Sequence, residues 1–288
     1  IVVDPMYGAG VSCAREVFER LGFEVVGLHE EAVCDFRGLH PAAREPWVDE
    51  CERMVIESGA RLGIVLDGDA DRMGIIDETG RLVSQHDLAP LALERLVAVD
   101  DHRDRVVATF ESSVRLQRQA ERLGLAYSRV PDGFSGVYRE FFEGDVLMGA
   151  DERGGVAVPS HLMERDGLVA ACLASSMLLA REETASKAVE RLASELGRTE
   201  WGYRNVPLDP ASLERLRNFL PGVNPREVVG VEPAEVSHAD GLRVTFEDDS
   251  WIMVRPSSTL PSVRVSAEAG TASDLSKLLA FGVSKVRI

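Results

Sequence analysis

Three aspartates occupy alternate positions directly after an apolar run: Asp67, Asp69 and Asp71 follow the segment 61 to 66. At this spacing, an extended or tightly turned backbone can direct all three carboxylates at one centre. Hard oxygen ligands of this kind suit Mg²⁺. The pattern therefore predicts a magnesium site on the loop that runs from Asp67 to Arg72.

Two other interpretations fit this acidic loop less well. An EF-hand calcium loop would place the aspartates at its first, third and fifth ligand positions, but it needs glycine at the sixth, where Arg72 stands. Its flanks should also be helices, whereas strands are expected here. A solvated acidic turn would leave three carboxylates repelling one another, because Arg72 alone is an incomplete counter-charge. Metal binding explains the pattern better.

A second set of residues able to do chemistry lies near the C-terminus. The candidate phosphate ligands there are Arg255, Ser257, Ser258, Thr259 and Arg264. Guanidinium groups, hydroxyls and the N–H groups of a tight turn can together surround a phosphate dianion. Taken alone, the segment is also explained by an ordinary hairpin between strands at 251 to 254 and 263 to 265. The phosphate interpretation therefore depends on the rest of the chain.

Several motifs in order make the chain resemble the α-D-phosphohexomutases, the phosphoglucomutase and phosphomannomutase family. Residues 67 to 72 read DGDADR, which is the form of that family's metal loop. Residues 1 to 10 and Leu39-His40-Pro41 resemble the start of its second domain and the approach to the metal loop. Residues 149 to 155, with ERDG at 164 to 167, resemble the third domain's sugar loop, and residues 255 to 264 resemble the phosphate loop RPSGTEPxxR. The resemblance covers the family's second, third and fourth domains.

The resemblance implies a role for each matching residue. Asp67, Asp69 and Asp71 would hold Mg²⁺, and Arg72 would assist catalysis near the transferring phosphoryl group. Asp151 and Arg153 would face the sugar hydroxyls. The five candidate phosphate ligands would bind the phosphate that does not react, so the partner is expected to be a phosphorylated hexose.

The sugar loop and the phosphate loop depart from the family pattern. Asp151 replaces the usual Glu of the sugar loop, and Arg153 replaces its Ser, so a bulky cation stands where a small hydroxyl is common. In the phosphate loop, Ser258 replaces the usual Gly and Leu260 the usual Glu. If that Gly needs a positive φ, Ser258 brings strain of about 1 kcal/mol or more. Which hexose phosphate is bound cannot be deduced from such altered loops.

Composition narrows the classes of function. The chain has 288 residues, with 32 Lys and Arg against 48 Asp and Glu, giving a net charge of −16 that opposes binding to nucleic acid or to an anionic membrane. Four scattered cysteines without a CxxC pair suit a reducing compartment and give no zinc framework. No apolar run approaches the roughly 20 residues of a membrane helix. We therefore expect a cytoplasmic protein with no nucleic-acid or membrane partner.

The elements that must position these residues predict an α/β protein of three domains. Strands and helices alternate over residues 1–100 and again over 101–200, which predicts two consecutive α/β/α domains with mixed sheets. Several strands in succession over 201–288 predict a C-terminal α+β domain with an antiparallel sheet. The three domains would bind the metal, the sugar and the phosphate in that order. The polar stretch 197 to 202 is the expected linker before the last domain.

Individual elements follow from periodicity and from stop signals. In the first domain, strands are expected at 1–4, 23–28, 61–66, 73–76 and 81–83, and helices at 11–21, from Pro46 to Gly59 and at 87–98, the last closing the domain. In the second, strands are expected at 106–110, 125–130 and 146–148, with helices at 113–123, 137–142, 167–179 and 185–196. The third would begin with a strand, followed by a helix at 211–220 and strands at 228–229, 242–246, 251–254 and 263–265. The Gly8-Ala9-Gly10 turn lacks the third glycine of a dinucleotide fingerprint, and strand-to-helix packing is its expected role.

The resemblance implies a phosphohexomutase, an isomerase that moves a phosphoryl group within a hexose phosphate through a phosphoserine. That serine belongs to the family's first domain, and no segment here resembles it. We therefore expect a missing serine-bearing domain, an entry of Ile1 into the middle of a larger polypeptide, and no mutase turnover by this chain alone. The alternatives are a non-catalytic sugar-phosphate-binding relative, acting as a sensor or partner subunit, and a metal-dependent sugar phosphatase.

Overall fold

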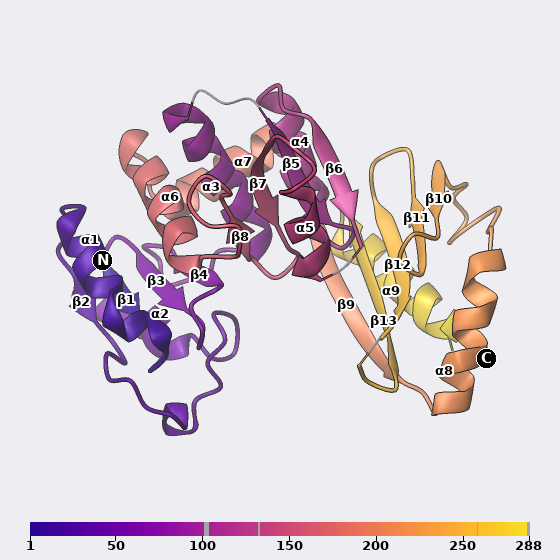
Figure 1. Cartoon of the computed structure of the whole chain (residues 1–288), viewed down its shortest axis with the longest axis horizontal. Helices are drawn as coiled ribbons and strands as arrows, with labels where there is room; N and C mark the ends of the chain where they lie inside the picture. Colours follow the sequence, from indigo (N-terminus) through magenta and orange to yellow (C-terminus); the bar gives the residue numbers. More distant parts are fainter. Residues whose placement is uncertain (101–103, 132, 258, 287–288) are drawn as a thin grey trace. The chain divides into compact units, whose positions relative to one another are not determined.

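The computed structural model describes residues 1–100, 104–131, 133–257 and 259–286. They form two compact units, Ile1–Leu196 and Gly197–Ile288, and each is considered by itself. The first unit holds two mixed sheets covered by helices, and the second holds one antiparallel sheet with helices (Figure 1). This confirms the predicted fold class. The predicted boundaries near residues 100 and 200 remain predictions.

The first sheet of unit 1 has the order β2-β1-β3-β4. Its strands are β1 (Val2–Asp4), β2 (Val26–Gly27), β3 (Gly63–Leu66) and β4 (Met73–Ile76), with β4 antiparallel to β3 and the other pairs parallel. The helices of this segment are α1 (Ala14–Arg20) and α2 (Asp49–Ser58), with 3₁₀ turns at Ala9–Ser12 and Phe36–Gly38. One face of the sheet packs on α2 through Cys51 and Val55, and the other on α1 through Ala14 and Phe18.

The second sheet of unit 1 has the order β6-β5-β7-β8, again with three parallel strands and an antiparallel edge. Its strands are β5 (Arg105–Thr109), β6 (Tyr127–Val130), β7 (Val146–Ala150) and β8 (Val156–Ala157). The helices are α3 (Gln85–Val99), α4 (Val114–Arg122), α5 (Phe134–Glu140), α6 (Gly167–Ala180) and α7 (Ala185–Leu196). Ser84, Ser113 and Asp166 cap α3, α4 and α6 by accepting backbone N–H groups of the first turn.

Helix α3 contacts α4 and α6 as well as strand β4 of the preceding sheet. A single apolar core runs from Val3, Ile64 and Leu66 of the first sheet to Val106 and Met148 of the second. The two sheets of unit 1 therefore share a core.

Unit 2 contains the antiparallel sheet β10-β11-β12-β13-β9. Its strands are β9 (Glu200–Pro207), β10 (Glu235–Ser237), β11 (Leu242–Thr245), β12 (Trp251–Pro256) and β13 (Ser262–Ala269). Helices α8 (Pro210–Phe219) and α9 (Ala272–Val286), with a 3₁₀ turn at Leu220–Gly222, pack on one sheet face through a core that includes Leu216, Leu279, Val254 and Val265.

Several predicted elements differ from those observed. The strand expected at 23–28 is reduced to Val26–Gly27, and the one at 81–83 to a single bridge at Leu82. Pro46 precedes α2 rather than entering its first turn, because the helix begins at Asp49. The expected strand at 228–229 is wrong, and the expected linker at 197–202 overlaps β9. Strands β8 and β10 and helix α9 were not predicted.

Candidate functional site at the Asp67–Arg72 loop

The acidic loop folds into a tight turn at the end of β3. The Asp67 carbonyl accepts the Ala70 N–H at 2.9 Å, and Asp67 Oδ1 accepts the Arg72 N–H at 3.0 Å. The Asp67 N–H in turn donates to the Arg72 carbonyl at 3.2 Å. Ala70 adopts a positive φ of 59°. This turn, rather than an extended backbone, brings alternate side chains together.

The turn places the three aspartates in one cluster. Carboxylate oxygens of Asp67, Asp69 and Asp71 all lie within 4.8 Å of one another. Burial raises the pKa of Asp67 to about 7; the charges of Asp71 and Asp69 add to the rise, while the N–H group and the guanidinium of Arg72 oppose it. A buried carboxylate beside two others gains from a further cation. The donor set, oxygen alone, therefore fits a hard divalent metal such as Mg²⁺.

The backbone of this loop is enclosed by two glycines from other segments. The Ala9 N–H donates to the Gly68 carbonyl at 3.0 Å, and a Cβ on Gly8 would lie 2.4 Å from the same oxygen. Gly167 donates to the Ala70 carbonyl at 2.9 Å, and a Cβ on it would lie 2.6 Å from the Arg72 carbonyl. The strand-to-helix packing expected of the Gly8-Ala9-Gly10 turn is not what the structure shows: Gly8 packs against the metal loop, and Gly10 against the side chain of Leu66.

The sugar loop, residues 149–155, reaches the metal loop through its last glycine. Gly155 forms an antiparallel bridge with Arg72, directly beyond the aspartates. Asp151 Oδ1 accepts the N–H groups of Arg153 and Gly155, both at 2.8 Å. Burial and the charge of Glu152 raise the pKa of Asp151, against those two N–H groups and Arg165. The structure therefore brings the predicted metal and sugar residues into one site.

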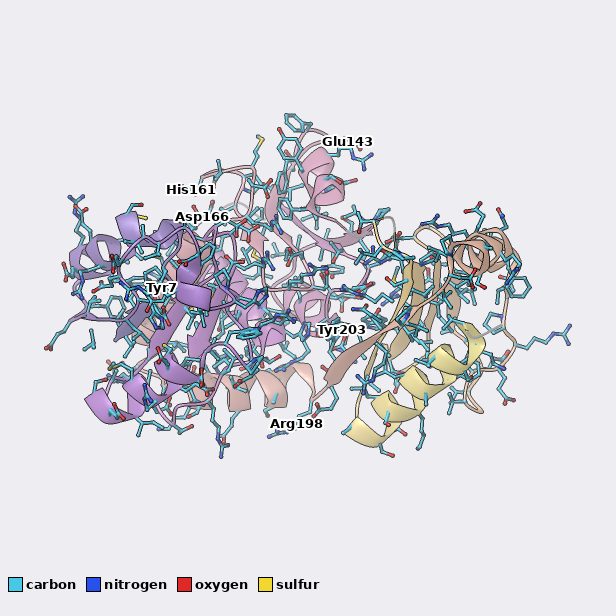
Figure 2. All side chains as sticks on the ribbon, turned by 90° about the horizontal axis from the view of Figure 1, so that it is seen from below. Tyr7, Glu143, His161, Asp166, Arg198 and Tyr203 are labelled. Carbon is cyan, nitrogen blue, oxygen red and sulfur yellow. The ribbon has the colours of Figure 1, made fainter. Side chains whose placement is uncertain are left out.

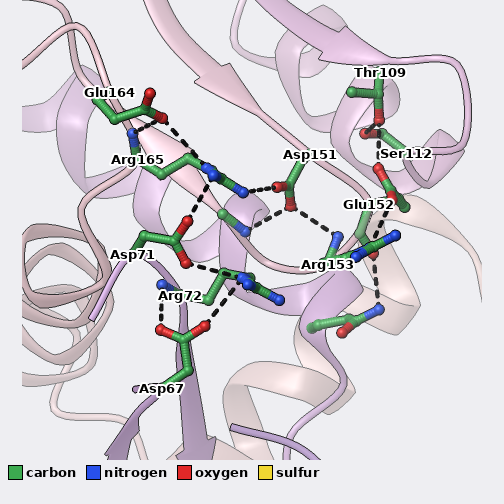
Figure 3. Close-up of polar contacts among 12 residues, drawn as sticks. Asp67, Asp71, Arg72, Thr109, Ser112, Asp151, Glu152, Arg153, Glu164 and Arg165 are labelled. Carbon is green, nitrogen blue, oxygen red and sulfur yellow. Dashed lines mark hydrogen bonds and ion pairs between the residues drawn. The ribbon is translucent and has the colours of Figure 1, made fainter. Parts of the chain in front are cut away.

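Arg165 joins the two loops and was not predicted. Its Nη2 lies 2.7 Å from Asp71 Oδ2, and its Nη1 lies 3.2 Å from Asp151 Oδ2 (Figure 3). Arg72 Nε lies 3.1 Å from Asp67 Oδ2 and 2.9 Å from Asp71 Oδ1. The ERDG segment identified Arg165 as part of a motif, but its partners are distant in sequence. Only the fold shows that it bridges them.

Arg153 lies beside a buried polar cluster behind the sugar loop. Its Nε lies 3.1 Å from Glu152 Oε1, while Glu152 Oε2 accepts the hydroxyl of Thr109 at 3.0 Å. Gln85 donates to the Glu152 carbonyl at 2.8 Å, which fixes the loop to α3. The Arg153 side chain is half exposed. One edge of its guanidinium group is therefore held by Glu152 through Nε, while the half-exposed side chain stays accessible to a ligand (Figure 3).

The predicted phosphate loop lies in unit 2, at the turn between β12 and β13. Arg255 and Arg264 face each other directly across the two strands. Ser257 Oγ accepts the N–H groups of Thr259 at 3.3 Å and Leu260 at 3.1 Å. Two of the turn's N–H groups are thus engaged by a side chain of the same turn.

Further contacts hold the loop in place. Arg264 lies over the ring of Tyr203 at 4.8 Å, and Arg217 of α8 donates to the Ser257 carbonyl at 2.5 Å. The prediction for Ser258 lies outside the described residues. The expected hairpin is formed by β12 and β13, and its register places Arg255 and Arg264 on the same face of the sheet.

His29 bridges two carboxylates of unit 1, those of Asp4 and Glu50. His29 Nδ1 lies 2.9 Å from Asp4 Oδ1, and His29 Nε2 lies 2.6 Å from Glu50 Oε2. The ring of Tyr7 lies 4.5 Å from the imidazole. Burial by itself would lower the pKa of His29, but the hydrogen bonds and charges of Asp4 and Glu50 together raise it.

Substituting His29 is expected to destabilise unit 1 in a pH-dependent way. Because the pKa is raised on folding, the stabilisation is fully present below the ordinary histidine pKa of about 6.5 and is lost as pH rises through the folded-state value. His29→Gln should therefore cost about 1 kcal/mol at pH 6 and less at pH 9. Urea unfolding at both pH values measures this, with the exposed His161→Gln as control. An equal cost at both pH values would contradict a charged bridge.

The other side chains considered are weaker candidates for a chemical role. His161 is exposed and pairs with Asp166, the cap of α6, at 3.2 Å (Figure 2). All four cysteines are free thiols. Among the described residues, no helix is both long and apolar enough to cross a membrane.

Comparison with known proteins identifies the class. Residues 1–80, 85–196 and 209–281 match the phosphoglucomutase/phosphomannomutase family models of α/β/α domain II, α/β/α domain III and the C-terminal domain. The chain belongs to the phosphoglucomutase/phosphomannomutase family.

Curated relatives and solved structures agree with this assignment. A probable phosphoglucosamine mutase of Methanosphaera stadtmanae is 27% identical over 96% of this chain and 59% of its own length. A phosphoglucosamine mutase of a Synechococcus species is 29% identical over 94% of this chain and 55% of its own length. The crystal structure of a putative phosphomannomutase from Thermus thermophilus is 27% identical, with a TM-score of 0.79 over 100% of this chain and 60% of that one. The chain thus spans between half and two thirds of the length of these relatives.

Proposed function

We propose that the chain provides the metal-, sugar- and phosphate-binding parts of a phosphohexomutase that acts on a hexose phosphate with Mg²⁺. One observation carries the proposal: three carboxylates converge on a turn that bridges to the sugar loop at Gly155 and is linked to Asp151 of that loop through Arg165. The relatives named as phosphoglucosamine mutases make an amino-hexose phosphate the first substrate to test.

In this proposal, each part of the site has a distinct task. Asp67, Asp69 and Asp71 hold Mg²⁺, which when bound neutralises charge on the transferring phosphoryl group. Arg72, already paired to Asp67 and Asp71, keeps its guanidinium at the rim of the cluster and orients the phosphoryl oxygens. Asp151 shapes the sugar loop through two N–H groups, and Arg153 presents the accessible cation to the sugar.

The second unit would hold the phosphate that does not react. Arg255 and Arg264 supply two guanidinium groups from opposite strands, and Ser257 and Thr259 supply hydroxyls on the turn between them. Ser258, outside the described residues, is a further candidate ligand from the sequence alone. Because Ser257 Oγ engages two N–H groups of the turn, its own hydroxyl proton remains for the ligand. We further propose that the phosphoserine of the reaction comes from the family's first domain, which lies outside the three matched segments.

Asp69→Asn tests the metal site most directly. Asp69 is exposed and has no hydrogen-bonding partner among the described residues, so its substitution should leave the fold intact. The loss of one of three carboxylate ligands should weaken Mg²⁺ binding by about a hundredfold. Titration calorimetry of the 288-residue chain with Mg²⁺ measures this, with Glu143→Gln as a control that removes an exposed carboxylate elsewhere in unit 1. Equal affinities in the wild type and Asp69→Asn would overturn the proposed site.

A non-catalytic sugar-phosphate binder is the second candidate function. It is favoured by Asp151, whose carboxylate is occupied by two N–H groups and by Arg165 rather than open to a sugar. The two candidates differ in their dependence on metal. Saturable glucosamine 6-phosphate binding that is unchanged in Asp69→Asn would favour the binder, and binding that requires both Mg²⁺ and Asp69 would favour the mutase.

A further inference from the structure

Arg165 is shared between two carboxylates that belong to different loops. Its Nη2 lies 2.7 Å from Asp71 Oδ2 on the metal loop, and its Nη1 lies 3.2 Å from Asp151 Oδ2 on the sugar loop. Both carboxylates are more buried than the arginine. The two ends of one guanidinium group therefore connect the metal ligands to the sugar loop.

The surrounding residues fix this arginine in place. Its guanidinium carbon lies 5.1 Å from the centre of the Phe134 ring, and its Nε lies 3.3 Å from Glu164 Oε1. Its Cδ lies against Gly155, where an added Cβ would approach it to 2.5 Å. The stem therefore has little freedom, and the guanidinium group stays within reach of Asp71, Asp151 and Glu164.

Each carboxylate oxygen of Asp71 already contacts an arginine. Oδ1 accepts a hydrogen bond from Arg72 Nε at 2.9 Å, and Oδ2 pairs with Arg165. A divalent ion bound to Asp71 would place a second positive charge beside an oxygen that already pairs with an arginine, so the ion and that arginine would compete electrostatically. Arg165 can release Asp71 and remain paired, because its Nη1 already contacts Asp151.

We infer that Arg165 is a positioning residue that pairs with both Asp71 and Asp151 in the absence of metal and with Asp151 alone when metal is bound, so that metal binding at the aspartate cluster is coupled to the sugar loop. When metal takes Asp71, Arg165 keeps only its pairing with Asp151 and tightens the sugar loop. By reciprocity, whatever strengthens the Arg165–Asp151 pair favours metal binding to the same extent. This inference rests on the metal site proposed above.

Arg165→Met separates this role from ordinary structural support. If Arg165 competes for Asp71, its removal should tighten Mg²⁺ binding by about tenfold, the loss of one partly buried ion pair. If Arg165 only holds the loops in place, its removal should loosen the cluster and weaken Mg²⁺ binding. Titration calorimetry with Mg²⁺, supported by Mn²⁺ electron paramagnetic resonance, measures the sign. Arg139→Gln, which removes an exposed arginine from α5, is the control for lost positive charge.

Asp151→Asn should act in the opposite direction through the same arginine. Without its alternative partner, Arg165 stays on Asp71, so Mg²⁺ affinity should fall by about threefold although Asp151 is not a metal ligand. In the double variant Arg165→Met/Asp151→Asn, the effect of Asp151→Asn should disappear. If Asp151→Asn acted only through long-range electrostatics, it would lower the Mg²⁺ affinity equally in the wild type and in Arg165→Met.

The outcomes are distinguishable from failure of the proposed function. Weaker binding in Arg165→Met, with circular dichroism showing an intact fold, would overturn the inference, as would additive effects in the double variant. Arg165→Lys keeps the positive charge but loses the two-ended guanidinium group. In this background, Asp151→Asn should lower the Mg²⁺ affinity by less than it does in the wild type. A fall as large as in the wild type would also contradict the inference. No Mg²⁺ binding by the wild-type chain at millimolar concentration would overturn the metal site itself, and the inference with it.

Discussion

Gly8→Ala is expected to destabilise the metal loop. The new Cβ would lie 2.4 Å from the Gly68 carbonyl oxygen and 2.9 Å from its carbon, and both are backbone atoms that cannot rotate away. Gly8 has a φ of −96°, which alanine adopts readily, so the whole effect comes from lack of space. We expect a loss of about 2 to 4 kcal/mol in unfolding free energy.

The same substitution should impair metal binding, because the loop must move to relieve the clash. Urea unfolding and Mg²⁺ titration of the variant measure the two effects together. Gly270→Ala is the matched control: no atom lies within 4 Å of the added methyl, so its stability should change by less than about 0.5 kcal/mol. A Gly8→Ala variant as stable as the control would show that the loop and the Gly8 turn are less closely packed than described.

Arg115→Met should cost about 3 kcal/mol in unfolding free energy at pH 8, because it leaves a buried carboxylate without its partner. Arg115 of α4 lies 2.5 Å from Asp87 of α3, and both side chains are buried. Burial raises the pKa of Asp87 to about 6, although the charge and hydrogen bond of Arg115 lower it. Without Arg115, that pKa rises further.

The sign of the pH dependence follows from this pKa. The folded value lies above the unfolded one, so the contribution of Asp87 to stability falls as pH rises from about 4 through 6 in the wild type. In Arg115→Met the fall continues to higher pH. The deficit of the variant should therefore be largest near pH 8 and shrink towards pH 5, as measured by urea unfolding at several pH values.

Neutralising the orphaned carboxyl provides the control for this prediction. Asp87→Asn/Arg115→Met removes both charges, so it should recover part of the stability lost in Arg115→Met, and its deficit should not depend on pH over the same range. A pH-independent deficit in Arg115→Met itself would mean that lost packing of the arginine stem, rather than the unpaired carboxylate, explains the destabilisation.

The metal cluster could be predicted from sequence because its ligands are neighbours on one turn. Asp67, Asp69 and Asp71 meet through hydrogen bonds that begin and end within residues 67–72. Arg165 illustrates the opposite case. Its partners Asp71 and Asp151 meet only after two sheets have packed together, and no local pattern records that arrangement.

The errors in the predicted strands have local physical causes. Val228 and Val229 favour a strand by residue type, but the chain turns there: Val229 and Gly230 both have positive φ, and Val228 bridges to Val231. The strands that were shortened or missed, β2, β8 and β10, are edge strands of two or three residues. Such short strands carry too few residues for alternation to identify them.

For the phosphate loop, the sequence predicted the residues but not their hydrogen bonds. Arg255 and Arg264 were expected to lie together, and the strand register pairs them. That Ser257 Oγ would accept two N–H groups of the turn depends on the turn's conformation, which residue types alone do not specify.

The enclosure of the metal loop by Gly8 and Gly167 has a consequence for the order of folding. Residues 67–72 are synthesised before Gly167, one of the glycines that confine them, which follows about a hundred residues later along the chain. During synthesis, the aspartates would therefore emerge as an unconfined acidic turn and gain their final geometry only when α6 docks. Metal would bind tightly to the completed unit and weakly to any precursor, so its uptake would report the end of folding rather than initiate it.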